Sequence, residues 1–382
     1  MKVKNTFFYF LALLFSAGLF SCEDKNTSNN GDEDGYGYDF TNVINTYVDD
    51  VILNTYTEMK DDATALYESV EAYAEDRSQD KLNDVCNKWR AMRIPWEQSE
   101  GFLFGPAALL SLDPSLDSWP LDKKSIDLIL NGQDAIDANR IASSNVHGFH
   151  AIEYIIFDGG KPKTASLNDR ELAYLQAATD YLRNDTYQLY ANWTGADNAS
   201  EEVSEALEEA EIEIQYYFAG QFKNAGKAGS TFISQSDAID QIIDGCIDIA
   251  SEVGSQKIGG PYNTAKVDYE QAVLEVESWY SWNSLADYRN NIISIRNSYF
   301  GGRNKTAANA SVNSISAFVK SKDAALDQEV TNAIEATVNA IDAITPPFRN
   351  AIQGGSNSKI DNAMDACANL EETLSKIKKL RN

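Results

Sequence analysis

Histidine is scarce in this sequence. Only His147 and His150 occur among 382 residues, which limits every metal-binding or acid–base hypothesis that needs an imidazole. Basic residues are also few, because 32 Lys and Arg accompany 58 Asp and Glu and give a formal net charge of −26. Nucleic-acid binders present a basic surface to the phosphates, so this charge excludes nucleic acid as a partner. An acidic surface attracts cations but does not identify a site for one.

Proline, glycine and cysteine are not abundant either. Eight prolines and 22 glycines exclude a collagen-like or linker-dominated chain, and a hydrophobic content of 43% excludes global disorder. The sequence has no HExxH motif, which excludes a zincin, and no GxSxG motif. After Cys22 the cysteines are Cys86, Cys246 and Cys367, without a CxxC pair. Each lies in a helical apolar pattern, so we expect buried thiols, with one disulfide and one free thiol as the alternative.

The first segment has the features of a signal peptide. A basic start precedes an apolar run over 7–20, which is shorter than the ~20 residues that span a bilayer. The small Ser21 before Cys22 fits a bacterial lipobox. We therefore predict a lipoprotein signal peptide over 1–21, with Cys22 acylated as the first residue of the mature protein. An ordinary secretory signal cleaved near Ser21 is the alternative.

Residues 22–38 have the composition of a flexible tether. They are acidic, polar and rich in glycine, and they hold too few apolar residues to fold. Acidic residues directly after the lipidated Cys22 resemble the export signal of Bacteroidetes surface lipoproteins. We therefore expect a monomeric outer membrane lipoprotein, facing the periplasm or the cell surface, whose membrane contact is the lipid anchor at Cys22.

The rest of the chain has helical periodicity. Apolar residues recur at helical spacing from Phe40 onward, as at Val43, Ile44 and Tyr47. Long periodic segments follow at about 169–193, 200–225, 235–257, 264–282, 284–300, 306–320, 323–344 and 359–381. Strand alternation is scarce and the prolines cluster outside the apolar stripes, so we predict an all-α fold.

A Gly/Ser-rich stretch at 225–232 lies near the middle of the chain and predicts a domain boundary. We predict an N-terminal helical domain over 39–228 and a C-terminal helical bundle domain over 229–382. Each half has a Trp- and Glu-rich segment followed by an apolar helix that ends in glycine, so an internal duplication is one interpretation. The later helix has no histidine, and any site therefore belongs to the first half.

The segment HGFHAIEY, residues 147–154, is the strongest candidate for chemistry. His150 and Glu153 are three apart on a predicted helix, so they share a face with Cβ atoms about 5–6 Å apart. That spacing lets an imidazole nitrogen and a carboxylate oxygen meet at one cation, as in the Glu-x-x-His pairs of di-iron bundles. A histidine bonded to its own glutamate inside the helix is the alternative. Gly148 would let another backbone or a ligand come close.

A His–Glu pair is incomplete as a zinc or iron site without a third ligand. Candidates lie in two neighbouring acidic segments and are Glu97, Glu100 and Asp117. A solvent-exposed helix face is the alternative for the two glutamates. Trp96 and Trp119 belong to the same segments, and packing in the core is the alternative to a place in a ligand cleft.

The segment GFHAIEY resembles the GxHxxE signature of the imelysin-like family. The similarity extends over the chain from about residue 40, through Trp89-Arg90, Arg93–Glu100, Phe104–Pro106, Leu116–Asp122, Gly260–Tyr262, Glu277–Trp282 and Asp287–Ile292.

The resemblance implies a secreted or outer-membrane-anchored bacterial protein with an all-helical fold of two bundle-like halves. It implies a site around the GxHxxE helix, near the interface of the halves, and so at Gly148, His150 and Glu153. The neighbouring matched segments add Arg93 and Ser278 to the cleft, beside the tryptophans and acids named above.

Three functions remain open at this stage. The first, favoured, is capture of iron, another metal or an iron-loaded ligand for an iron-uptake system, which the family resemblance implies. The second is a metallopeptidase in which His150 and Glu153 are zinc ligands and an unidentified glutamate polarises water. The third is a metal-free module for a peptide or small molecule in the cleft between the domains. The sequence offers no third zinc ligand at a recognisable spacing, which favours binding over peptidase activity.

Overall fold

The computed structural model describes residues 35–164 and 166–381. The predicted signal peptide 1–21, the predicted acylation site Cys22 and most of the predicted tether 22–38 lie outside the described residues. Tyr36, however, is fully buried, and its hydroxyl donates to Asp240. The packed body therefore begins before the predicted end of the tether. Every helix of the described part falls short of the length and apolar character that a membrane crossing requires.

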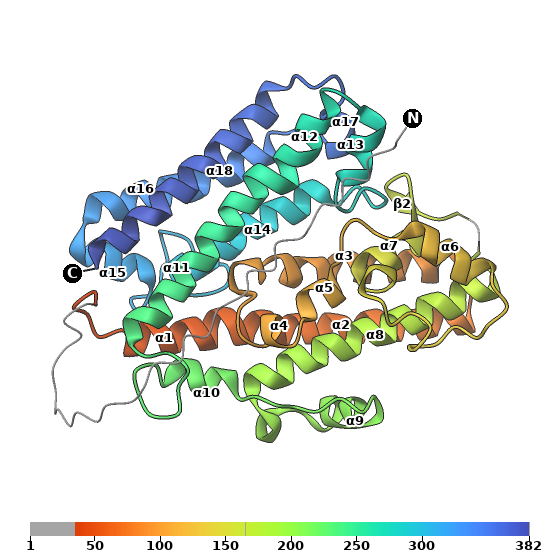
Figure 1. Cartoon of the computed structure of the whole chain (residues 1–382), viewed down its shortest axis with the longest axis horizontal. Helices are drawn as coiled ribbons and strands as arrows, with labels where there is room; N and C mark the ends of the chain where they lie inside the picture. Colours follow the sequence, from red (N-terminus) through yellow and green to blue (C-terminus); the bar gives the residue numbers. More distant parts are fainter. Residues whose placement is uncertain (1–34, 165, 382) are drawn as a thin grey trace, which may run out of the picture.

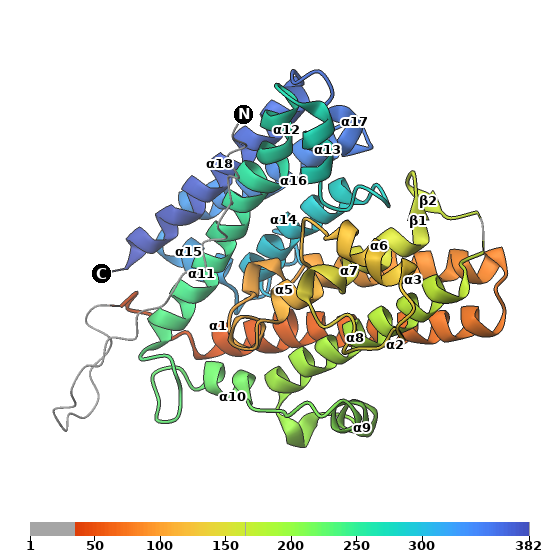
Figure 2. The same cartoon turned by 45° about the vertical axis from the view of Figure 1, so that its right-hand side comes forward.

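The first half of the chain forms the lower group of helices in Figures 1 and 2. The helices are α1 (Thr41–Thr46), α2 (Asn54–Glu75), α3 (Gln79–Glu97), α4 (Pro106–Leu109), α5 (Leu112–Leu116), α6 (Lys123–Asn131), α7 (Phe149–Ile156), α8 (Asp169–Thr194), α9 (Glu201–Glu209) and α10 (Phe218–Lys223). A π-helical turn, Tyr47–Leu53, joins α1 to α2. The long helix α2 packs against both α3 and α8.

The second half forms the upper group in the same views (Figure 2). The helices are α11 (Gln235–Glu252), α12 (Gly259–Ala265), α13 (Tyr269–Glu275), α14 (Ser284–Phe300), α15 (Ile315–Lys322), α16 (Ala324–Asp342), α17 (Phe348–Ala351) and α18 (Ser358–Ile377). A second π-helical turn, Val253–Ile258, joins α11 to α12. Helix α18 packs against α11 and α16.

The predicted all-α fold is confirmed. Within the described residues the only strands are β1 (Phe157–Asp158) and β2 (Lys161–Pro162), a short antiparallel hairpin that follows α7. The three buried cysteines are all free, as expected from their apolar surroundings.

Several predicted helix boundaries are wrong. The predicted helix 200–225 is divided into α9 and α10, because Glu211 turns the chain with a positive φ of 58°. The next residues are held extended by Asn192, whose side-chain oxygen accepts hydrogen bonds from the amides of Gln215 and Tyr216. The predicted helix 264–282 ends at α13, and the predicted helix 306–320 begins only at Ile315.

Local capping explains the start of the long helix α8. The side chain of Asn168 accepts from the amides of Arg170 and Glu171, and Glu171 accepts in return from the amide of Asn168. This capping box satisfies backbone donors that the first helical turn leaves without partners. Ser200 caps α9 in a related way, by accepting from the amide of Val203.

The two halves share one large apolar core. Helix α3 packs against α14, where the side chain of Gln98 donates to Asn290 at 2.8 Å. The turn after α3 lies so close to α11 that a Cβ on Gly245 would be 2.2 Å from the carbonyl oxygen of Gly101. The division into domains 39–228 and 229–382, and their origin by duplication, stay predictions.

Candidate metal centre

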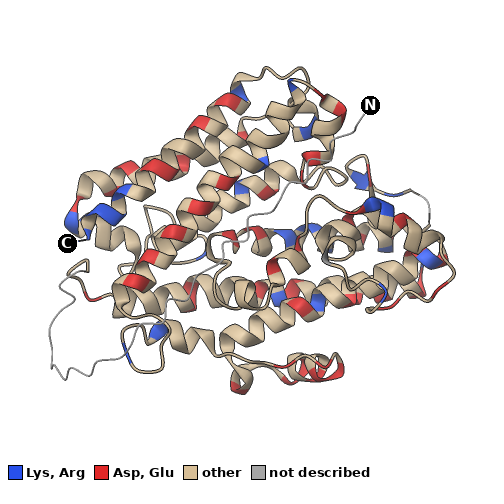
Figure 3. Ribbon diagram, viewed as in Figure 1, with Lys and Arg blue, Asp and Glu red and all other residues tan. Residues whose placement is uncertain are grey.

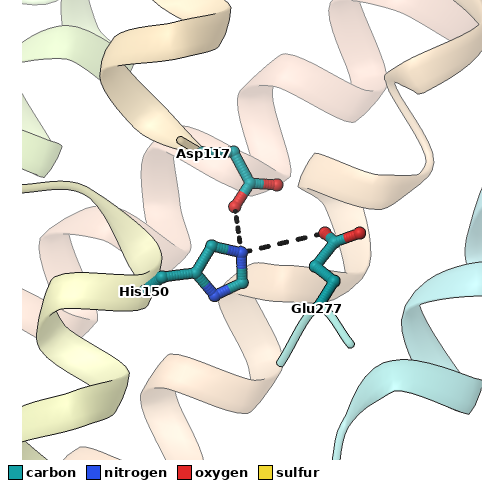
Figure 4. Close-up of side chains that lie close together, drawn as sticks. All are labelled: Asp117, His150 and Glu277. Atoms are coloured by element: carbon teal, nitrogen blue, oxygen red, sulfur yellow. Dashed lines mark ion pairs between the residues drawn. The ribbon is translucent and has the colours of Figure 1, made fainter. Parts of the chain in front are cut away.

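The GxHxxE segment starts helix α7 against the backbone of α5. Gly148 has a φ of +82°, and a Cβ at this position would lie 2.4 Å from the carbonyl oxygen of Leu116. Only glycine fits both the backbone conformation and the available space. This close approach brings Asp117, the residue after α5, next to the side chain of His150 (Figure 4).

The imidazole of His150 lies between carboxylates from both halves of the chain. Its Nε2 atom is 2.9 Å from Oδ1 of Asp117 and 3.8 Å from Oε1 of Glu277 (Figure 4). Although these contacts are close, Nε2 is buried and has no partner in hydrogen-bond geometry. Its other nitrogen, Nδ1, bonds Oε2 of Glu153 at 2.9 Å. The ring therefore has one nitrogen fixed and one nitrogen directed at two carboxylates.

Glu153 orients His150 and is fully engaged in doing so. Its Oε1 accepts from the backbone amide of Ser281 at 2.7 Å, while Oε2 bonds Nδ1 of the imidazole. The segment that carries Ser281 is held in turn by Arg90, which donates to the carbonyl oxygen of Ser281 at 2.8 Å. The two nitrogens of an imidazole point away from each other, so Glu153 faces a different side of the ring from Asp117 and Glu277.

Arg93 is the central cation of the cluster. Its side chain has no exposed surface and contacts four carboxylates, those of Glu97, Asp117, Glu277 and Asp287. The Nη1–Oδ1 distance to Asp117 is 2.6 Å and the Nη2–Oε1 distance to Glu277 is 3.0 Å. A buried guanidinium with several charge-assisted bonds is compensated for the loss of water.

The charges in the cluster divide its carboxyl groups into two kinds. Burial favours the neutral form of all of them, and it raises the pKa of Glu97 and Asp287 above the usual range. For Asp117 the charges of Arg93 and His150 outweigh burial and hold its pKa far below the usual range. For Glu277 burial is likewise outweighed, chiefly by Lys257 and His150, and the pKa falls to about 2.

His150 gains a proton from the same arrangement. Burial alone would lower the pKa of His150, but the carboxylates of Asp117, Glu153 and Glu277 raise it well above the usual value. The imidazolium form is therefore stabilised between Asp117 and Glu277, whose pKa values are held below the usual range. A positive charge at Nε2 is what these oxygens favour.

A cavity of about 510 Å³ opens beside this cluster. Asp117 and Glu277 form part of its wall, so two of the carboxylates near Nε2 reach the cavity. The other acidic lining residues are Glu100, Asp113, Glu252 and Glu275. Among the described lining residues, Lys257 is the one basic residue. Its Nζ lies 3.1 Å from Oε2 of Glu277 and 3.6 Å from Oε1 of Glu100.

Both predicted tryptophans contact the cluster. The indole of Trp96 donates to Oδ2 of Asp117, and the ring of Trp119 stands edge-on to His150 with centroids 4.7 Å apart. Trp119 also donates to the carbonyl oxygen of Glu275 at 3.2 Å, which ties the first half of the chain to the second across the cavity wall.

The structure brings most of the residues singled out in the sequence together. Arg93, Trp96, Glu97, Asp117, Trp119, His150 and Glu153 contact one another, and Gly148 forms the close contact beneath them. Glu100 lies at the edge of the cluster with Lys257, and Ser278 is buried with a left-handed φ of 52°. Glu97 is not on a solvent-exposed face, since it is fully buried.

Sequence reasoning missed three members of the cluster, Glu277, Asp287 and Lys257. Glu277 immediately precedes Ser278 in a segment that resembles the family, so that similarity was an available signal. Asp287 begins another such segment. Lys257 gave no signal, because it reaches the cluster from the π-helical turn Val253–Ile258, which apolar periodicity does not reveal.

These residues fit a metal ion. The ligand atoms of Asp117, His150 and Glu277 all lie within 4.8 Å of one another, and they offer one imidazole nitrogen and two carboxylate oxygens. Nitrogen and oxygen donors of this kind suit zinc and iron. The buried Nε2 atom without a hydrogen-bond partner is the structural observation that supports the fit. With an ion bound, Glu153 would hold the far side of the ring, as the carboxylate does in carboxylate–histidine–metal arrangements.

Comparison with known proteins agrees with this architecture. The Imelysin family, peptidase family M75, matches residues 52–377. Iron-regulated protein A of Synechococcus elongatus is 30% identical over 270 residues, which are 71% of this chain and 67% of that protein. The crystal structure of a putative iron-regulated protein A precursor from Parabacteroides distasonis has 37% identity and a TM-score of 0.78, covering 90% of this chain and 95% of that one. An imelysin-like protein from Psychrobacter arcticum shares the fold at 13% identity, with a TM-score of 0.62 over 87% of this chain and 93% of its own.

Proposed function

This chain belongs to the imelysin family, and on that premise we propose that it is an extracytoplasmic protein that binds iron or another metal cation. The proposed ligands are His150 Nε2, Asp117 and Glu277. The observation that carries the proposal is the buried Nε2 atom, which faces two carboxylates without a hydrogen-bond partner. The name of the relative from Synechococcus elongatus, iron-regulated protein A, supports iron as the metal.

The side chains around the ligands prepare them for a cation. Glu153 holds the imidazole by Nδ1, so that Nε2 is the nitrogen left to coordinate. Arg93 and Lys257 keep the carboxylates of Asp117 and Glu277 ionised. His150 must give up its Nε2 proton before it can act as a ligand, so uptake of a cation releases a proton.

The acidic cavity supports capture of a cation from dilute solution. Carboxylates that line a recess raise the local concentration of cations there. The cavity adjoins Asp117 and Glu277, so a cation that enters it meets two ligands directly. A volume of about 510 Å³ also accommodates a small iron complex in place of the bare ion.

The N-terminal sequence supports a location outside the cytoplasm. A lipobox at Cys22 and an acidic tether suit a protein that is anchored to the outer membrane and collects its ligand there or at the cell surface. An iron-uptake system is then the partner that would receive the ligand. These features of location and partnership form part of the proposal.

A peptidase is the second candidate, and one observation favours it. Asp113 lines the same cavity, and burial together with the charge of Asp117 raises its pKa to about 6. A carboxyl group with such a pKa can act as a general base near neutral pH. In that case a metal held by His150, Asp117 and Glu277 would supply Lewis-acid chemistry, and Asp113 would accept the proton from water.

A metal titration tests the proposal. Purified protein lacking residues 1–22 is titrated with Fe²⁺ under anaerobic conditions and with Zn²⁺, and the stoichiometry is read by calorimetry and elemental analysis. We expect one metal per chain, abolished in His150→Ala and weakened about 10–100-fold in Glu153→Gln, because Glu153 acts behind the ligand. An unchanged titration of His150→Ala would refute the site.

The same preparation separates binding from peptidase activity. Protein loaded with zinc is incubated with denatured protein substrates, and the products are separated by mass. If the protein is a binder, no cleavage occurs. Cleavage that stops in Asp113→Asn would favour the peptidase, and cleavage that persists in Asp113→Asn and in His150→Ala would indicate a contaminating protease.

A further inference from the structure

One buried carboxyl group, that of Asp185, has no part in the proposed metal centre. Asp185 on α8 is only 6% exposed, and its Oδ2 accepts a hydrogen bond from the hydroxyl of Ser115. Its other oxygen, Oδ1, has no hydrogen bond among the described residues. Asp185 also lines a cavity of about 640 Å³, a volume typical of sites for small molecules. Oδ1 is therefore the atom of this carboxyl group that is left to accept a hydrogen bond from a ligand in the cavity.

The cavity is closed on one side by α9. This short helix packs on α8 through a small apolar cluster of Tyr187, Ala191, Val203 and Leu207, which is separate from the main core. Tyr67 from α2 and Ala138 from the loop after α6 complete the wall. The cavity therefore lies entirely within the first half of the chain.

Negative charge dominates the surroundings of this cavity. Seven glutamates lie between residues 201 and 213, and no Lys or Arg occurs from 184 to 222. Figure 3 shows this concentration of acidic residues on α9 and the residues after it, at the bottom of the molecule. Glu209 belongs to this group and lines the cavity with Asp180 and Asp185.

The one basic residue among the described lining residues is already engaged. The guanidinium of Arg183 donates to Asp180 at 2.6 Å and lies over the ring of Tyr67, 3.9 Å from its centroid. Arg183 thus offsets Asp180 and leaves Asp185 and Glu209 without a counter-charge. The same guanidinium covers the face of Tyr67 through a cation–π contact within the cavity wall.

From these observations we propose that the cavity between α8 and α9 binds a small organic cation with an ammonium head group. The ammonium donates to Oδ1 of Asp185, the polar side chains of Asn184 and Gln188 offer further acceptors, and the aliphatic part lies against Ala206 and Ile212. A positive charge beside Asp185 favours its ionised form, so the ligand and the carboxylate stabilise each other.

Calorimetric titration with putrescine tests this site, with 1,4-butanediol as the neutral analogue of equal length. We expect one putrescine per chain, no measurable binding of butanediol, and at least a tenfold loss of putrescine affinity in Asp185→Asn. The control Asp197→Asn removes an exposed acid of the same segment that does not line the cavity, and its affinity should stay within twofold.

A second variant keeps the test valid if Asp185→Asn alters the fold. Ala138 is exposed and lines the cavity, so Ala138→Trp should obstruct it without disturbing the core, whereas the neighbouring exposed Asn139→Trp should bind putrescine normally. Equal affinity in Ala138→Trp and Asn139→Trp, or equal binding of butanediol and putrescine, would overturn the proposal. Displacement of putrescine by millimolar Ca²⁺ at matched ionic strength would identify an inorganic cation site and overturn it as well.

Discussion

His147 lies just before helix α7 and His150 lies in its first turn, yet their surroundings shift the two pKa values in opposite directions. Burial lowers the pKa of His147, whose partners are the carbonyl oxygen of Ile141 and the hydroxyl of Ser115. Burial acts on His150 too, but its carboxylate partners raise its pKa. The same side chain is thus kept neutral in one place and protonated in the other, and the difference lies in the partners rather than in the depth of burial.

The neutral histidine belongs to a chain of hydrogen bonds that ends at Asp185. Nδ1 of His147 donates to the carbonyl oxygen of Ile141 at 2.7 Å, and Nε2 lies 2.9 Å from the hydroxyl of Ser115, which also bonds Asp185. One hydroxyl proton cannot serve both neighbours. In the structure this proton goes to Oδ2 of Asp185, and burial raises the pKa of that carboxyl group to about 7.

The largest effect on stability is expected from replacing Arg93, the buried cation of the cluster around His150. Arg93→Met leaves four buried carboxyl groups without their guanidinium, and we expect a loss of about 3–5 kcal/mol in the free energy of unfolding. Urea denaturation measures it. The control Arg289→Met breaks an exposed pair with Asp342 and should cost about 0–1 kcal/mol. Equal losses in the two variants would show that the cluster around His150 tolerates unpaired charge.

A smaller effect is expected from Asp185 and depends on pH. Its pKa is higher in the folded chain than in the unfolded chain, so its contribution to stability is complete below about pH 4 and is lost as the pH rises to about 7. Between pH 5 and pH 8 the free energy of unfolding of the wild type should therefore fall by about 1–3 kcal/mol relative to that of Asp185→Asn. The exposed Asp197→Asn should show no such trend, and a flat difference for Asp185→Asn would contradict the assignment.

The smallest effect is expected from His147, and it tests whether the two histidines act separately. His147→Gln loses hydrogen bonds to Ile141 and Ser115 but touches none of the proposed metal ligands, so we expect a loss of about 1–2 kcal/mol in stability. Its metal titration should match that of the wild type, in contrast to His150→Ala. Loss of metal uptake in His147→Gln would mean that the two rings form one functional unit.

The sequence predicted the first half of the metal centre better than the second. Helical spacing places His150 beside Glu153, and acidic segments nearby supply Asp117 and Glu97, all within the first half. Helical periodicity likewise predicted α8, α14 and α16 closely. These features depend on neighbours along the chain, which a sequence displays directly.

The remaining proposed ligand, Glu277, depends on contacts between segments that are distant along the chain. Ser281, which holds Glu153, lies 128 positions after it, and the segment before α14 folds back over α7 instead of continuing α13 as a helix. Glu277 comes from this segment. Its approach to His150 follows from packing between the halves, and no local pattern encodes it. The sequence also implied that Glu153 shares a cation with His150, whereas its oxygens are occupied by Nδ1 and the amide of Ser281.

The origin of the three proposed ligands has a consequence for the stability of the whole chain. Asp117 and His150 come from the first half and Glu277 from the second, so an ion bound by all three would cross-link segments that are distant along the chain. A disulfide persists in the unfolded chain and restricts that ensemble, whereas an ion that only the folded chain holds would stabilise the folded state by mass action. Loading and release of the proposed ion would therefore also change how tightly the segment between α13 and α14 is held to α7.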